Sequence, residues 1–280
     1  MACGAGTNII NAEEIAAKYP FFALQDIQAG SLNTVDEGAF DALGMVQSLR
    51  NRAQQFGADY INNEVTSMTR VDNKFVTSIT LKTGEIITAG IIVDAAGTCA
   101  VQVSRRASVD LPDEARRRYT YIFSVDEPLG QDLPLTIDPT GVHMRSYGKN
   151  DYLVGCPPIS PDMAVDPDDF GYAEDVWNEK MLPVLKKRNP QFSTAKVTHS
   201  WMGHYEFNTF DHNAIIGPHS EVSNLMFCVG FSGNGSQQAP ACGRGVAEII
   251  TYGQFRTLDL LSLAYDRISR NEPLLERAVI

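Results

Sequence analysis

The sequence feature that most restricts the fold is an apolar run that passes through a glycine-rich turn into a helical segment. The turn reads Val229-Gly230-Phe231-Ser232-Gly233-Asn234-Gly235-Ser236-Gln237-Gln238-Ala239-Pro240. Residues 224–229 are predicted to form a strand, and the segment from about 240 to 252 a helix. Glycine permits positive φ and a close ligand, and the free N–H groups of a helix N-terminus attract a negative group. The pattern predicts either such a ligand site or a tight strand-to-helix connection without a ligand.

A second apolar stretch, residues 91–97, ends in small side chains and reads Ile-Ile-Val-Asp-Ala-Ala-Gly. Small residues at the carboxyl end of a strand let a flat ligand or another backbone lie close, which is where α/β sheets bind ligands. The same pattern fits a buried strand that enters a tight turn. By contrast, Gly4-Ala5-Gly6 fails as a dinucleotide fingerprint, because no strand precedes it and Ile9 stands where the third glycine belongs.

The order of predicted elements indicates an α/β protein that contains an inserted sheet. Helices are predicted at 11–19 and 41–55, and strands at 59–65, 74–81 and 86–93. From about 101 to 197 short β-rich runs alternate with Pro- and Asp-rich turns, with a single helix at about 172–187. We therefore expect a mainly antiparallel sheet domain of α+β type at 106–197, inserted into a domain formed by 1–105 and 198–280.

Composition excludes several classes of function. The net charge of −11 and the absence of a large basic cluster argue against nucleic-acid binding. No apolar run approaches the ~18 residues of a membrane span. The five cysteines lack C-x-x-C spacing and the five histidines lack H-x-x-x-H spacing, so no metal site is expected. Free thiols favour a reducing compartment, which predicts a cytoplasmic protein, or a mitochondrial matrix protein in a eukaryote.

An aromatic stretch at residues 201–211 contains His204 and Tyr205. Aromatic side chains beside an imidazole can line an apolar cleft where the imidazole polarises a substrate. An aromatic-rich strand is more often a component of a hydrophobic core. The sequence leaves both interpretations open.

Taken in order, these stretches resemble the FAD-dependent oxidoreductases typified by D-amino-acid, glycine and sarcosine oxidases and dimethylglycine dehydrogenase. The C-terminal signature of that family is roughly G-F-S-G-H-G-x-Q-Q-A-P-x-x-G-R-x-V-A-E, and it matches residues 230–248 with Asn234 in place of the histidine. Residues 230–245 are similar to the FAD-dependent oxidoreductase domain proteins linked to complex I assembly and to their bacterial relatives. The resemblance extends over essentially the whole chain.

The resemblance implies a doubly wound FAD-binding domain and hydride transfer from the carbon next to nitrogen in an amine or amino acid to flavin N5. The implied cofactor-binding residues are Val65 beside the adenine, Ala96 and Gly97 beside the dinucleotide, and Gly230, Phe231, Ser232, Gly233, Asn234, Gly235, Ser236 and Gln237 beside the isoalloxazine. The implied catalytic residues are His204, Tyr205 and Arg145. Arg145 is a candidate for binding a substrate carboxylate, although a solvated charge at a strand edge is an equal alternative.

Two departures from the family pattern limit these expectations. His204 stands about where sarcosine oxidases have the cysteine that links to flavin, so that linkage is not expected. The family pattern opens with a strand, G-x-G-x-x-G, a helix and an acidic residue, a βαβ unit that holds the ADP half of FAD and that this sequence lacks. We expect a truncated chain, a chain completed by a second chain that supplies the unit, or a non-catalytic assembly or interaction protein derived from the fold.

Overall fold

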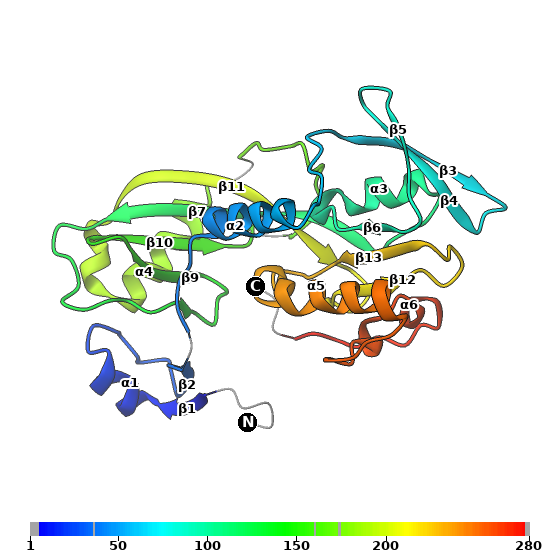
Figure 1. Cartoon of the computed structure of the whole chain (residues 1–280). Coiled ribbons are helices and arrows are strands. Elements are labelled where there is room, and N and C mark those ends of the chain that lie inside the picture. Colours follow the sequence, from blue (N-terminus) through cyan, green and yellow to red (C-terminus); the bar gives the residue numbers. More distant parts are fainter. Residues whose placement is uncertain (1–5, 36, 160, 173–174, 278–280) are drawn as a thin grey trace.

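The computed structural model describes residues 6–35, 37–159, 161–172 and 175–277, and it confirms a mixed α/β architecture. Figure 1 shows the largest sheet, with strands β7, β9, β10 and β11, on the left and the strands β6, β12 and β13 on the right. The N-terminal strands β1 and β2 lie below the large sheet. Gly4 and Ala5 of the rejected fingerprint lie outside the described residues.

The large sheet has five antiparallel strands in the order β11-β7-β10-β9-β8. Its strands are β7 (Asp113–Ser124), β8 (Thr136–Ile137), β9 (His143–Tyr147), β10 (Asp151–Cys156) and β11 (Lys196–Asn208). Side chains alternate between the two faces of a strand, so β7 places Tyr119, Tyr121 and Phe123 on one face. That face packs against α4 (Leu182–Arg188), whose Leu185 is fully buried.

The second sheet forms the other half of the molecule, with the strand order β12-β13-β6. β13 (Leu225–Val229) runs parallel to β6 (Ile92–Asp94) and antiparallel to β12 (Ile215–Pro218). β13 is apolar along its length because both of its faces are covered. The helix α5 (Gly235–Tyr252) packs against Ala214 and Ile216 through Cys242 and Val246.

A three-stranded meander, β3 (Val65–Val71), β4 (Phe75–Leu81) and β5 (Ile86–Thr88), joins this half, with α3 (Ala100–Arg106) packed beside it. The predicted strand at 59–65 is wrong except for Val65, because the polar residues before it pair with no strand. The run 86–93 forms two strands rather than one, because Gly90 interrupts it before β6.

The predicted helices are present with shifted boundaries. The helix predicted at 172–187 begins only at Trp177, as the π-helical turn Trp177–Met181 that continues into α4. The helix α5 begins five residues before Pro240, which lies inside it and leaves the Ser236 carbonyl without a helical N–H partner. The remaining elements are the 3-10 turns Gly97–Cys99, Pro190–Thr194 and Leu261–Leu263, and the helix α6 (Asp266–Ser269).

The N-terminal segment is held to the inserted sheet by an ion cluster in which Arg188 and Asp138 are buried and Asp26 is exposed. β1 (Thr7–Asn11) pairs with β2 (Ala29–Asn33), and α1 (Ala12–Lys18) begins at a capping box between Asn11 and Glu14. The Arg188 guanidinium donates to Asp138 and, at 2.5 Å, to Asp26. Hydrogen bonds from Arg188 and Lys187 hold the pKa of Asp26 well below its ordinary value.

The helix α2 (Ala42–Gln55) differs from the others because none of its residues is buried. Leu43, Val46 and Leu49, spaced three apart on one face, are 84%, 61% and 59% exposed. None of the helices in the described ranges has the length and apolar character needed to cross a bilayer.

Candidate functional site

The carboxyl ends of the parallel strands β6 and β13 lie next to each other, because Asp94 pairs with Phe227 across them. The loop after β6 contains Gly97 at φ 55°, and the turn after β13 contains Gly230 at φ 75° and Gly233 at φ 95°. A Cβ atom added to Gly97 would meet nothing within 4 Å. This edge of the sheet, called the β6–β13 crevice below, is the position at which α/β proteins bind ligands.

The helix α5 points its N-terminus into this crevice with its first turn bare. No side chain caps that turn and it contains no acidic residue. Gly233, Ser236 and Gln237 are exposed, and Asn234 and Gly235 are half-buried. The unpaired N–H groups and the partial positive charge of this 18-residue helix suit a negative group of a ligand.

Each of the two loops donates a backbone hydrogen bond to a carboxyl group that fixes its position. Asp94 accepts the Ala96 N–H at 3.1 Å and the Ser104 hydroxyl at 2.6 Å. Glu206 of β11 accepts the Phe231 N–H at 3.3 Å. The sequence-predicted residues Gly230, Phe231 and Ser232 are themselves buried, so they support the turn rather than face solvent.

The serine of the turn is locked in a conformation that residues other than glycine rarely adopt. Ser232 has φ 47° and is fully buried. Its Oγ accepts the Asn208 N–H at 3.0 Å, and the Asn208 side chain donates to the Asn213 carbonyl at 2.5 Å. The end of β11 thus fixes the backbone of the turn, which presents Gly233 at its exposed tip.

The predicted catalytic residues His204 and Tyr205 point to opposite faces of β11, because they are adjacent in a strand. His204 Nε2 lies 2.9 Å from the Asp169 carbonyl, and its ring lies 4.7 Å from the ring of Phe170. Asp169 also forms an ion pair with Arg117. His204 therefore anchors the 169–170 loop over one face of the sheet.

Tyr205 joins a polar cluster on the face opposite the aromatic core. Its hydroxyl accepts a hydrogen bond from the Arg118 guanidinium, which also lies over its ring at 3.9 Å. Arg118 and Arg116 both form ion pairs with Asp162. Burial raises the pKa of Tyr205, with Arg118 opposing the shift, so the phenol remains a hydrogen-bond donor at neutral pH.

Arg145 lies on the same face but farther from the turn. Arg145 pairs with Leu153 of β10, which pairs with Ile122 of β7, which in turn pairs with His199 of β11. The turn contacts β11 farther along that strand, at Glu206. Three strand spacings separate β9 from β11, roughly 14 Å, and the offset along the strand adds roughly 23 Å. The structure thus brings Tyr205 together with Arg118 and separates both from Arg145.

Sequence reasoning missed Arg118, Arg116 and Glu206. The signal for the arginines is the run Arg116-Arg117-Arg118. Because alternate residues of a strand share a face, the first and third arginines were predictable as a pair once the run was placed in β7. Across the described ranges, no group of three His, Cys, Asp or Glu side chains is arranged to hold a metal ion.

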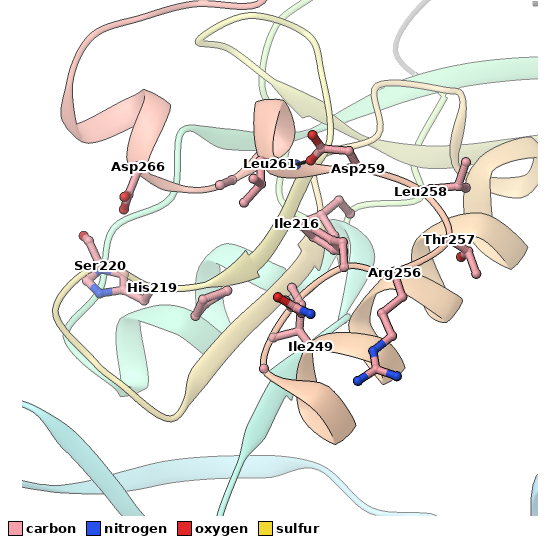
Figure 2. A pocket seen from close by; sticks show the side chains of 15 residues that line it. Ile216, His219, Ser220, Ile249, Arg256, Thr257, Leu258, Asp259, Leu261 and Asp266 are labelled. Atoms are coloured by element: carbon pink, nitrogen blue, oxygen red, sulfur yellow. Dashed lines mark hydrogen bonds between the residues drawn. The ribbon is translucent and has the colours of Figure 1, made fainter.

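A cavity of about 680 Å³ lies at the other end of α5. Figure 2 shows Ile216, His219, Ile249 and Leu261 among the side chains that line it. The helix separates this cavity from the β6–β13 crevice by roughly 27 Å at 1.5 Å per residue. It is therefore distinct from the crevice.

Comparison with known proteins agrees with this geometry. The profile described as "FAD dependent oxidoreductase" matches residues 2–249. The chain belongs to this FAD-dependent oxidoreductase family. It is 32% identical over 306 residues to FAD-dependent oxidoreductase domain-containing protein 1 of Bos taurus and 31% identical to that of Mus musculus, in both cases over 99% of the chain and 63% of the relative.

Two solved structures show the same fold. L-proline dehydrogenase from P. horikoshii superposes with a TM-score of 0.84 at 23% identity, and the superposition covers 96% of this chain and 71% of the dehydrogenase chain. Glycine oxidase from Geobacillus kaustophilus superposes with a TM-score of 0.75 at 20% identity, and the superposition covers 94% of this chain and 67% of the oxidase chain. The chain therefore spans about 63% of the length of the curated relatives that it matches.

The family uses FAD, and the residues of the crevice fit a flavin. The open space beside Gly97 accommodates a ligand at the end of β6. The bare N-terminus of α5 suits the pyrimidine side of the isoalloxazine, where negative charge appears on reduction. Val65 lies at the start of β3 in a separate sheet, and its predicted role beside the adenine remains a prediction.

Proposed function

We propose that this chain forms the flavin-facing and substrate-facing parts of an oxidoreductase that oxidises an amine or an amino acid. The observation that carries the proposal is the cluster of Arg116, Arg118 and Tyr205 on the polar face of the inserted sheet. Guanidinium and phenol groups recognise a carboxylate by charge and by hydrogen bonding. The proposed division of the chain is 1–105 with 198–280 for the cofactor and 106–197 for the substrate, and β11 joins the two parts.

In this proposal FAD, when bound, would supply the hydride acceptor for oxidation of the carbon next to the substrate nitrogen. Gly233 to Gln237, at the N-terminus of α5, would hold the pyrimidine side of the isoalloxazine and would stabilise negative charge there. Tyr205 and Arg118 orient the substrate carboxylate, and His204 keeps the 169–170 loop in place. Arg145 is the alternative carboxylate anchor.

The visible spectrum of the purified chain tests the proposed function directly. We expect bound flavin near stoichiometry, or quenching of FAD fluorescence when FAD is added. A colourless protein that does not quench added FAD would contradict flavin binding by this chain.

Replacement of the two candidate anchors tests the substrate assignment. Arg118→Met is expected to raise KM for an amino acid at least about tenfold, because each lost charge-assisted hydrogen bond contributes ~1.5–3 kcal/mol. Arg145→Met, the same change to the other candidate, is expected to have little effect on KM. The reverse order of effects would assign the carboxylate to Arg145.

A second candidate function is a non-catalytic assembly or interaction protein, and the exposed face of α2 favours it. Leu43, Val46 and Leu49 form an apolar stripe that nothing in the described ranges buries. The stripe suits an apolar surface of the FAD-binding fold, supplied by this chain or by a second chain. It suits equally an unrelated protein partner. Loss of flavin binding together with retained partner binding would favour the second function.

A further inference from the structure

Glu206 occupies an unusual position for a carboxylate. It lies on β11 beside the buried end of the strand, and it holds the cofactor turn through the N–H groups of Gly230 and Phe231. Its second oxygen, Oε2, is buried and has no hydrogen-bond partner among the described residues. A glutamine at this position could hold the turn with its single amide oxygen. Holding the turn therefore does not explain why the side chain carries a second buried oxygen.

The ionisable groups that interact with Glu206 are acids from three neighbouring strands. They are Asp94 of β6, Asp113 of β7 and Cys228 of β13. Burial raises the pKa of Glu206, and Asp94 adds to the shift. Burial and the charge of Glu206 raise the pKa of Asp113 to about 7. Neighbouring acids whose charges interact in this way do not all ionise together.

We propose that Glu206 is a positioning residue for the flavin, and that the protonation of its carboxyl group sets the reduction potential of the flavin through the Gly230–Phe231 turn. This inference rests on the proposed flavin site. The ionised carboxylate binds the two N–H groups more tightly but places a negative charge behind the N-terminus of α5. That charge opposes the negative charge of reduced flavin, so the ionised form favours oxidised flavin and the neutral form favours reduced flavin.

The first arm of the test requires no flavin. Infrared difference spectra of the protein, recorded against pH, report buried carboxyl groups that titrate above the ordinary range, and hydrogen exchange reports protection of the Gly230 and Phe231 amides. In Glu206→Gln we expect one such titration to vanish and amide protection to lose its dependence on pH. The matched control Glu85→Gln removes an exposed carboxylate and leaves both observables unchanged.

The second arm measures the midpoint potential of bound flavin between pH 6 and 8. Glu206→Gln is expected to shift the ratio of affinities for reduced and oxidised flavin by about tenfold toward the reduced form, which is about 30 mV for a two-electron couple. Glu206→Asp, which keeps the charge, is expected to retain the pH dependence of the wild type.

The two arms separate failure of this inference from failure of the proposed function. Unchanged carboxyl titration and amide protection in Glu206→Gln overturn the positioning role, whether or not flavin binds. Normal flavin binding with the wild-type potential in Glu206→Gln overturns the control of potential. A chain that shows the expected titration but binds no flavin contradicts the proposed function and confines Glu206 to shaping the turn.

Discussion

The buried carboxyl group of Asp113 predicts that this fold loses stability as the pH rises toward neutrality. Asp113 is 7% exposed, and its pKa rises from the ordinary 3.8 to about 7 through burial and the nearby charge of Glu206. Between these two values the folded chain retains a proton that the unfolded chain has lost. The free energy of unfolding therefore falls with pH across this window, by up to about 1.4 kcal/mol per pH unit for this group.

Asp113→Asn removes the ionisation and keeps an acceptor oxygen for the Glu114 N–H, which lies 3.0 Å away. The whole shift corresponds to about 4 kcal/mol between pH 4 and 7. From pH 5.0 to 6.5 the variant is therefore expected to gain about 2 kcal/mol relative to the wild type. The lowered pKa values of Asp26, Asp138 and Asp211 act at lower pH, because the stability that they contribute is lost only in acid.

Urea unfolding at a series of pH values measures this effect through the difference between the two proteins. Asp110→Asn is the matched control, because it makes the same change on an exposed side chain three residues away. Its stability curve should run parallel to that of the wild type. A parallel curve for Asp113→Asn as well would refute the argument that Asp113 is protonated in the folded state.

Two further changes test the turn and the C-terminal packing. Gly233→Val should abolish flavin retention, because φ 95° is strained for valine and the side chain would enter the crevice. Gly243→Val, on the exposed side of α5, should retain flavin. Equal flavin retention by the two variants, measured from the visible spectrum, would show that the flavin does not bind at this turn. Arg267→Met leaves Asp211 buried without the partner now 2.6 Å away and should lower the free energy of unfolding by about 3–5 kcal/mol. Arg270→Met breaks an exposed pair and should lower it by less than about 1 kcal/mol, and similar losses in urea unfolding would contradict the burial argument.

Short-range patterns made much of the architecture predictable. The capping box at Asn11 sets the start of α1, and the apolar run before Gly230 marks β13 as a strand with both faces covered. The alternation of strands and helices indicated the α/β class, and the match to residues 230–248 indicated the family. These features depend on neighbouring residues, so the sequence displays them directly.

The site itself depends on contacts between distant parts of the chain. The crevice exists because β6 pairs with β13, more than a hundred residues later. The sequence could not rank Arg145 against Arg118, because only the register of β7, β10 and β9 shows which guanidinium lies beside Tyr205. Glu206 carries no sequence signal at all, since its role arises from a backbone N–H group, that of Phe231, 25 residues away.

The amino-acid sequence by itself determined the class of fold, the family and the glycine-rich turn that we propose faces the cofactor. Only the tertiary structure decided which polar side chains share a face and which carboxyl groups are buried together. The physical reason is that secondary structure follows local periodicity, whereas a pKa shift or a binding cluster follows from distance and exclusion of water. Both quantities are set by strand register and packing between segments far apart in the chain.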